Sequence, residues 1–175
     1  VVTGEKTQTR RIIKPQPDSR GLRTTNVMFE DWHGREIKPK YKVGEIVYLK
    51  EPYVISGSYI IYKFGSTIGQ ECDKAGVKWK NKLFMPESAA RHFIKITAVG
   101  AERLQDISEE DCLKEGIEEV IWKGKILKSS KHYFNGYESY DTPIEAYAEL
   151  IDRINGNGTF QRNPFVWVYD FKLIK

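Results

Sequence analysis

The segment of residues 4–11, Gly-Glu-Lys-Thr-Gln-Thr-Arg-Arg, holds the densest group of chemically capable side chains in this sequence. It supplies a lysine, two hydroxyl groups and two arginines, namely Lys6, Thr7, Thr9, Arg10 and Arg11. Lysine and arginine can hold an anion or a carbonyl oxygen, and a threonine beside a base can act as a nucleophile. We therefore expect the working pocket of the protein to be built around this segment.

The backbone that carries these residues limits which of them can meet. Its β-branched side chains favour a short strand over residues 7–13. On a regular strand alternate side chains share a face, so Thr9 and Arg11 lie together and Lys6 points to the other face. Lys6 and Thr9 can meet only if the chain turns near Thr7. A solvated basic strand without chemistry is the alternative interpretation.

Positive charge is concentrated in two places, although the net charge is only +4. The first 25 residues contain the basic side chains Lys6, Arg10, Arg11, Lys14, Arg20 and Arg23 and the acidic side chains Glu5 and Asp18. A second basic run, over residues 123–132, lies between aromatic residues. Such patches attract phosphates and give salt-dependent affinity. For the second run, a solubilising surface is the alternative interpretation.

The rest of the composition predicts a protein without a metal, a cofactor or a membrane anchor. Cys72 and Cys112 are far apart and the histidines are scattered, so no spacing typical of a zinc site occurs. We expect both cysteines to be reduced thiols. No apolar stretch approaches the roughly 20 residues that cross a bilayer, and no signal peptide is visible. We therefore expect a cytoplasmic protein, and its length suits one domain.

The pattern along the chain predicts several short strands and two or three helices. Strands are expected at residues 46–49, 79–84, 93–99 and 164–171, and hairpins at residues 53–64 and 120–127. One helix is expected after Ser108, and a longer one after the capping residue Thr142. Residues 26–40 are expected to be a surface excursion with a short hairpin turning at His33. This inventory predicts an α+β fold.

The pattern G-x-K-x-x-x-x-R, filled by Gly4, Lys6 and Arg11, resembles the signature of the ASCH family. Three further elements follow in the family's order: residues 44–47, a helix at 107–115 after the strand at 93–99, and a closing strand at 165–171. The resemblance implies an α+β fold in one domain over residues 1–175, a small PUA-like β-barrel with two or three flanking helices. Insertions relative to the family are expected near residues 15–40 and 117–140.

The segments K-T-Q-T-R-R, M-P, L-Q-D-I-S-E-E-D and N-P-F-V-W-V are similar to a phage and prophage subgroup of that family. A phage origin would place the protein in the host cytoplasm. The resemblance implies binding of RNA or a modified nucleobase or nucleoside in a cleft around the motif. The implied ligand-binding residues are Gly4, Arg10, Arg11, Glu51 and Arg91. A phage accessory module that binds a protein partner through its insertions is an alternative.

A second alternative is an enzyme. Lys6, Thr9 and Glu115 fall on the proposed catalytic positions of the bacterial N4-acetylcytidine amidohydrolases, another branch of the family. The resemblance implies that Thr9 attacks the acyl carbonyl, Lys6 transfers a proton, and Glu115 acts as general base or orients the others. This chain departs from that branch at Gln8 and Arg10, where the branch is apolar. A changed pocket wall implies another substrate, or binding without turnover. A ribonuclease is a further possibility.

Overall fold

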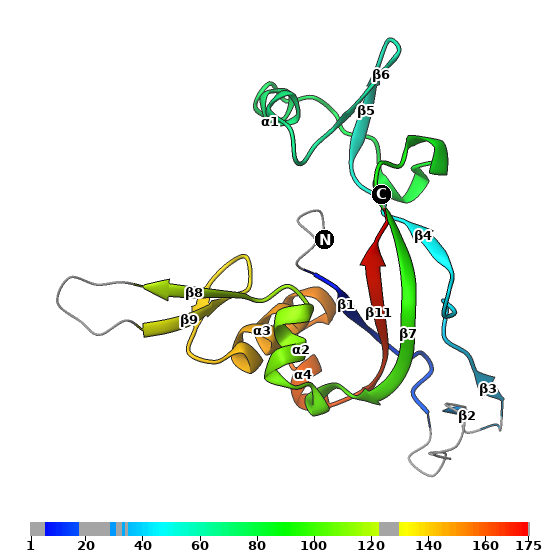
Figure 1. The fold of residues 1–175 in the computed structure, drawn as a ribbon, viewed down its shortest axis with the longest axis vertical. Coiled ribbons are helices and arrows are strands. Elements are labelled where there is room, and N and C mark those ends of the chain that lie inside the picture. Colours follow the sequence, from blue (N-terminus) through cyan, green and yellow to red (C-terminus); the bar gives the residue numbers. More distant parts are fainter. Residues whose placement is uncertain (1–5, 18–28, 31–32, 34, 123–129, 175) are drawn as a thin grey trace.

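The computed structural model describes residues 6–17, 29–30, 33, 35–122 and 130–174. At its centre lies an antiparallel sheet with the strand order β1-β11-β7-β4. These strands are β1 (Gln8–Ile12), β11 (Phe165–Leu173), β7 (Phe93–Arg103) and β4 (Ile46–Tyr48). The long strands β7 and β11 curl the sheet into a half-barrel (Figure 1), and a register shift between Asp170 and Phe171 falls within this curved pair. The fold is therefore mixed α+β.

One face of the sheet is covered by short helices. These are α2 (Glu109–Lys114), α3 (Pro143–Asn155) and α4 (Thr159–Arg162). The core beneath them packs Tyr147 and Ile151 of α3 against Val166 and Val168 of β11. Helix α3 begins at a capping box in which Thr142 and the third helical residue bond each other's backbone amides, as its sequence predicts. This layer fixes α2 beside strand β1.

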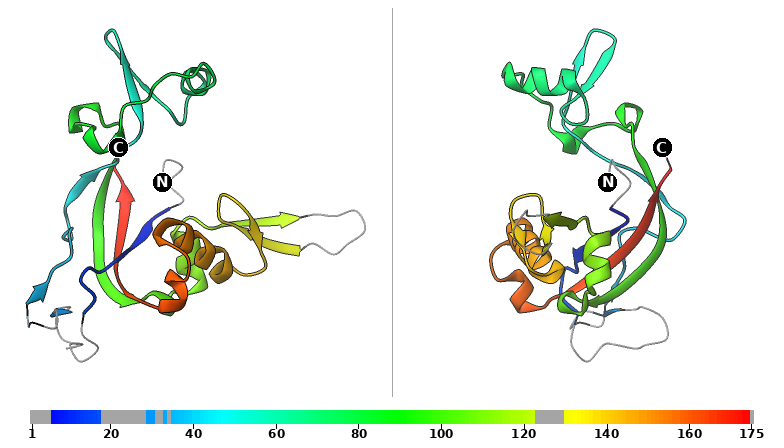
Figure 2. Two further views of the ribbon diagram at one scale, coloured as in Figure 1. Left: turned by 180° about the vertical axis from the view of Figure 1, so that it is seen from behind. Right: turned by 60° about the vertical axis from the view of Figure 1, so that its left-hand side comes forward.

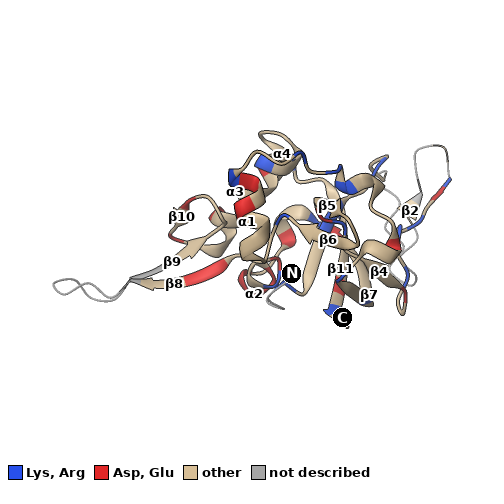
Figure 3. Cartoon of the chain, turned by 90° about the horizontal axis from the view of Figure 1, so that it is seen from above, with Lys and Arg blue, Asp and Glu red and all other residues tan. Residues whose placement is uncertain are grey.

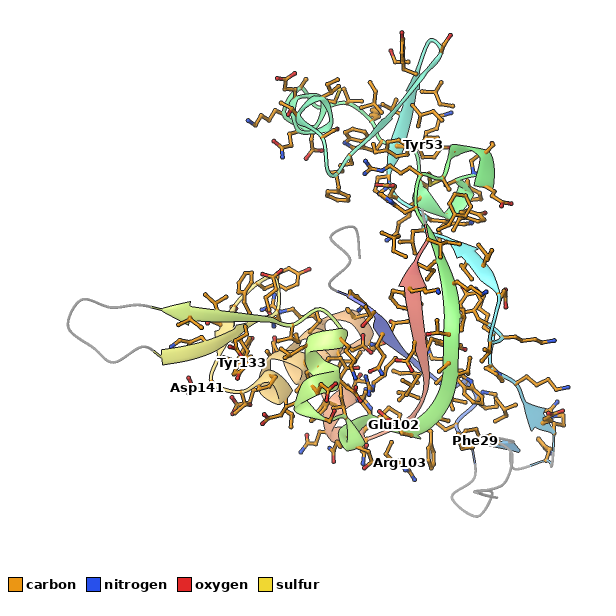
Figure 4. The ribbon with its side chains drawn as sticks, in the orientation of Figure 1. Phe29, Tyr53, Glu102, Arg103, Tyr133 and Asp141 are labelled. Carbon is orange, nitrogen blue, oxygen red and sulfur yellow. The ribbon has the colours of Figure 1, made fainter. Side chains whose placement is uncertain are left out.

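The opposite face of the sheet carries a second, aromatic core. Phe29 packs edge-on against Trp167 with ring centroids 5.2 Å apart, and Ile94 and Ile96 of β7 complete the layer. Figure 4 places Phe29 on the side of the sheet away from the helices. Phe29 belongs to a small hairpin of β2 (Phe29–Glu30) and β3 (Glu36–Ile37). The expected surface excursion therefore contributes a core residue.

Two arms extend from this body at separate ends (Figure 2). The first contains β5 (Tyr53–Ser56), β6 (Tyr59–Tyr62), α1 (Thr67–Lys74) and the 3-10 turns η1 (Lys82–Phe84) and η2 (Glu87–Ala89). Its core is small and centres on Tyr53, Met85 and Ala89. The second is a three-stranded sheet of β8 (Glu118–Trp122), β9 (Ser130–Phe134) and β10 (Ser139–Tyr140). A further 3-10 turn, η3 (Leu104–Asp106), follows β7.

Most of the expected elements are confirmed, and one is wrong. The Ser108 cap of α2, the hairpin at residues 53–64 and the hairpin around His33 are present. The strand expected at residues 79–84 is not: Lys80 makes one isolated bridge, and the Asn81 side chain then caps η1. Helices α1 and α4 were not expected. The described residues therefore contain four α-helices, where two or three were predicted. Most of the hairpin expected at residues 120–127 lies outside the described residues, which end at residue 122 and resume at residue 130.

Within the described ranges, no helix is both long and apolar enough to cross a membrane. The same ranges contain no group of three or more His, Cys, Asp or Glu side chains that could hold a metal ion. Both cysteines are free thiols, as expected, with Cys112 buried and Cys72 partly exposed.

Candidate functional site

Strand β1 presents the predicted chemical segment on two faces. The strand is regular from Gln8 to Ile12 and pairs antiparallel with β11. Gln8 donates from its side chain to the carboxylate of Asp170, its cross-strand partner, at 2.7 Å. Gln8 and Arg10 therefore face the helices, and Thr9 and Arg11 face the aromatic core side. The two faces have different chemistry and are described in turn.

On the helix face, Arg10 forms a closed ionic network within the protein. Its guanidinium donates to Glu102 at 2.7 Å, to Asp111 at 3.2 Å and to Glu115 at 3.4 Å, and also to the Gln8 side chain. The Arg10 side chain has no solvent exposure. We call Arg10 with these three carboxylates the Arg10 network. Each of the three guanidinium nitrogens donates to a group of its own chain.

Charges within the network shift the pKa values of Arg10 and Asp111. Burial opposes the charge of Arg10, but the hydrogen bond and charge of Glu102 outweigh it and raise the arginine's pKa. Burial likewise opposes ionisation of Asp111, but Lys114 and Arg10 outweigh it and hold the pKa of Asp111 below its usual value. Both shifts favour the charged forms of Arg10 and Asp111, and the ion pairs of Arg10 tie α2 to the sheet.

Lys6 lies at the rim of this network. Its ammonium group donates to the backbone oxygen of Glu115 at 2.7 Å and to the Glu115 carboxylate at 3.0 Å. The Lys6 side chain is 26% exposed, whereas Glu115 is 5% exposed. Gly116, whose φ of +100° favours glycine, places its backbone against the aliphatic part of Lys6. The structure therefore joins the two predicted residues Lys6 and Glu115 in one partly accessible pair.

Two other reactive groups in the helix layer are buried. The Tyr147 hydroxyl has no hydrogen-bond partner among the described residues. Burial, with the negative charge of Glu115, raises the pKa of Tyr147, and burial raises the pKa of Cys112 to about 12. Both shifts favour the neutral form of the side chain, and a buried neutral thiol is a poor nucleophile.

The other face of β1 opens into a cavity of about 480 Å³, here called the Arg11 pocket. Its polar lining consists of the cations Arg11, Lys14, Lys38 and Lys40, and its aromatic lining of Tyr41, Trp167 and Tyr169. The isoleucines Ile12, Ile13 and Ile37 complete the wall, and no carboxylate is among the described residues that line the pocket. The Lys38 ammonium group pairs with the Glu36 carboxylate at 2.9 Å. The described lining of the pocket therefore combines positive charge with aromatic surface.

The aromatic side chains of the Arg11 pocket are held in place by their own contacts. The Tyr169 hydroxyl accepts a hydrogen bond from the Lys40 backbone amide at 3.0 Å, and its ring meets the Tyr41 ring edge-on at 5.5 Å. The Lys40 ammonium group lies 5.2 Å from the centre of the Tyr41 ring. Burial is the main cause that raises the pKa of Tyr169. The floor is thus rigid and neutral, and the cations line its rim.

The predicted site residues are only partly brought together. Lys6 and Glu115 pair, but Thr9 lies on the opposite face of β1 from Arg10, and no hydrogen bond in the described structure joins its hydroxyl to that pair. Arg10 is enclosed by carboxylates, whereas Arg11 opens into a pocket. Gly4 lies outside the described residues.

Glu51 and Arg91 bind each other rather than reaching strand β1. Arg91 donates to both Glu51 carboxylate oxygens at 2.8 and 2.7 Å and to the Phe64 backbone oxygen at 2.6 Å. Its guanidinium also lies 4.3 Å from the centre of the Tyr62 ring. These contacts fasten the β5–β6 arm to the end of the central sheet. In this structure the pair has a positioning role within the arm.

Sequence reasoning missed the part of the Arg11 pocket that comes after β3. Lys38, Lys40 and Tyr41 lie in the run Lys-Pro-Lys-Tyr-Lys, where three lysines flank a proline and a tyrosine. That run is the signal that could have identified them, since such interleaving is typical of nucleic-acid-binding surfaces. Comparison with protein-family models, curated proteins and solved structures found no match to this chain. The site must therefore be judged on its own geometry.

Proposed function

We propose that the protein binds a phosphate-bearing nucleic-acid component, RNA or a nucleotide, in the Arg11 pocket. The observation that carries this proposal is the pocket lining, in which the described residues are four cations, three aromatic residues and three isoleucines. Lysine and arginine attract phosphates through a salt-dependent interaction. Stacking of a nucleobase on an aromatic side chain contributes about 1–3 kcal/mol per base to binding. Few other ligand classes use both features at once.

The dimensions of the pocket agree with a ligand of this size. Its volume of about 480 Å³ lies within the range of roughly 300–1,000 Å³ usual for small-molecule sites. The rim cations Arg11 and Lys40 would hold a phosphate, and the partly exposed Tyr41 ring would contact the base. Trp167 and Tyr169 are held on β11, so little ordering entropy is lost on binding. We also infer that the curled sheet belongs to a PUA-like barrel, on the resemblance of the G-x-K-x-x-x-x-R segment.

A ligand panel tests this function. Tryptophan fluorescence of the protein is recorded during titration with a nucleoside, the matching nucleotide and a short single-stranded RNA, each at low and high salt. Trp167 lines the pocket and is the expected reporter, so Trp167→Phe removes the signal. We expect the nucleotide and the RNA to bind and to weaken with salt, and the uncharged nucleoside to bind less. Equal, salt-independent responses to all three ligands would contradict the proposal.

One observation favours a second function, hydrolysis of an acylated base. Lys6 and Glu115 are held within hydrogen-bonding distance at a partly exposed rim, as the amidohydrolase resemblance implies. Thr9 lies on the opposite face of β1, which disfavours it as the nucleophile of this pair. Mass spectrometry of an N4-acylated cytidine incubated with wild type, Thr9→Ala and Glu115→Gln tests the idea. Loss of the acyl group with wild type but not with Glu115→Gln supports hydrolysis, and unchanged substrate throughout excludes it.

A further inference from the structure

The cations of the Arg11 pocket come from two separate segments of the chain. Arg11 belongs to β1, and Lys14 lies just beyond the end of that strand. Lys38 and Lys40 belong to the segment that follows β3. All four residues are exposed to solvent. The positive charge of the described lining is thus contributed by two segments that are distant in sequence, and the pocket forms only where they meet.

The buried side chain of Tyr169 brings the two segments together. Its hydroxyl accepts a hydrogen bond from the backbone amide of Lys40 at 3.0 Å. Burial raises the pKa of this hydroxyl, while amide hydrogen bonds from Lys40 and Tyr41 and the charge of Arg11 act to lower it. The Arg11 guanidinium is therefore close enough to act on the same oxygen that holds the Lys40 backbone. Arg11 and Lys40 accordingly share one small region of the pocket.

Neither of these two cations is paired with a carboxylate in the part of the chain that the structure describes. The Lys40 ammonium group instead lies over the Tyr41 ring, 5.2 Å from its centre. Lys38 differs, because it pairs with Glu36. Figure 3 shows the acidic start of β8 as a continuous red segment at the far end of the molecule from β2. A ligand can therefore supply the negative charge that Arg11 and Lys40 attract.

A phosphate monoester suits this arrangement better than a phosphodiester. A terminal phosphate carries a charge of about −1.5 to −2 near neutral pH and offers several acceptor oxygens. Each phosphate within a nucleic-acid strand carries a single negative charge. The pocket volume of about 480 Å³ is that of a small-molecule site. A terminal phosphate can enter such a site with one chain leaving it, whereas an internal phosphate needs room for the strand on both sides.

We propose that the Arg11 pocket selects a terminal phosphate monoester, which is the phosphate of a free nucleotide or of an RNA end, and that Arg11 and Lys40 bind it together. This inference rests on the proposed function and narrows its ligand class. The Arg11 guanidinium presents a planar fork to two phosphate oxygens, and the Lys40 ammonium group contributes a point charge. An internal phosphate offers these two residues less charge and is bound more weakly.

Matched ligands test this preference. Isothermal titration calorimetry of the full chain compares a nucleoside monophosphate with its monomethyl phosphate ester, which keeps the nucleoside and the phosphorus but only one negative charge. We expect the monophosphate to bind about tenfold more tightly. Equal affinities would overturn the inference while leaving nucleic-acid binding in place. If neither ligand nor a single-stranded RNA bound, both the inference and the proposed function would fail.

Two labelled RNAs of one sequence, with and without a terminal phosphate, distinguish the two sources of the monoester. A preference of about tenfold for the phosphorylated RNA identifies an RNA end as the ligand. A preference for the monophosphate over its methyl ester, with equal binding of the two RNAs, identifies a free nucleotide. Both results support selection of a terminal phosphate. Equal binding within both pairs of ligands would overturn it.

A lysine substitution tests whether Lys40 contributes to the preference. Lys40→Gln removes the ammonium group but keeps the backbone amide that bonds Tyr169, and circular dichroism checks that the variant is folded. We expect the ratio of monophosphate to methyl-ester affinity to fall toward one. Lys42→Gln is the matched control, because Lys42 is exposed on the same segment but is not among the described lining residues. A wild-type ratio in Lys40→Gln, or an equal loss in Lys42→Gln, would overturn the inference.

Discussion

Removing the Arg10 guanidinium should destabilise the protein far more than removing an exposed arginine. Arg10→Met keeps most of the side-chain volume but removes the cation that three carboxylates share, so that Glu115 is left with Lys6 and Asp111 with Lys114. Glu102 and Asp111 are 28% and 24% exposed and can regain water, whereas Glu115 cannot. Removing one partner of a buried ion pair lowers stability by about 3–5 kcal/mol. Because two of the carboxylates can rehydrate, we expect Arg10→Met to lower the free energy of unfolding by about 3 kcal/mol. The free energy of unfolding of a typical domain is roughly 5–15 kcal/mol, so this loss is large.

Urea unfolding at neutral pH, followed by circular dichroism, measures this loss. Arg153→Met is the matched control, since Arg153 also pairs with two carboxylates, Glu138 and Glu149, but at an exposed site. Exposed pairs contribute about 0–1 kcal/mol, so the control should unfold near the wild-type midpoint. Glu115→Gln added to Arg10→Met should restore part of the stability by removing the buried charge. Equal midpoints for Arg10→Met and the control would refute the structural role assigned to the network.

Three further predictions follow from other contacts. Arg91→Ala, which releases Glu51 and the Phe64 backbone, should speed amide hydrogen exchange in β5 and β6 while leaving β7 protected. The pKa of Asp111 is lower in the folded protein than its unfolded value of about 3.9, so the ionised Asp111 stabilises the fold above that pH. This contribution is lost as the pH falls through the folded pKa. Asp111→Asn should therefore make Tm depend less on pH in the acidic range. A thiol reagent should label Cys72 in the native protein and Cys112 only after unfolding.

Capping residues in the sequence correctly predicted where helices α2 and α3 begin. The capping box at Thr142 and the cap at Ser108 satisfy backbone amides within one turn, so the start of each helix is written in the adjacent sequence. The failure at residues 79–84 has the same physical origin. Asn81 bonds the Leu83 amide two residues ahead, and this short-range bond outweighs the apolar residues that suggested a strand.

The candidate site depended on contacts that no local pattern encodes. Strand alternation predicted that Thr9 and Arg11 share a face, and the structure confirms it. The same alternation could not reveal that Arg10 faces the acidic side of α2, because Glu102, Asp111 and Glu115 approach it from distant parts of the chain. The aromatic wall of the Arg11 pocket likewise needs β11 and the segment after β3 to meet.

One titration tests the central claim most directly, namely that the Arg11 face of β1 binds nucleic acid. Fluorescence anisotropy of a labelled single-stranded RNA is measured against wild type, Arg11→Ala and the exposed control Lys78→Ala at several salt concentrations. A charge-assisted contact contributes about 1.5–3 kcal/mol, so Arg11→Ala should weaken binding about tenfold or more and lower the salt slope by about 1. Lys78→Ala should match wild type. Equal affinities and slopes for wild type and Arg11→Ala would contradict the account.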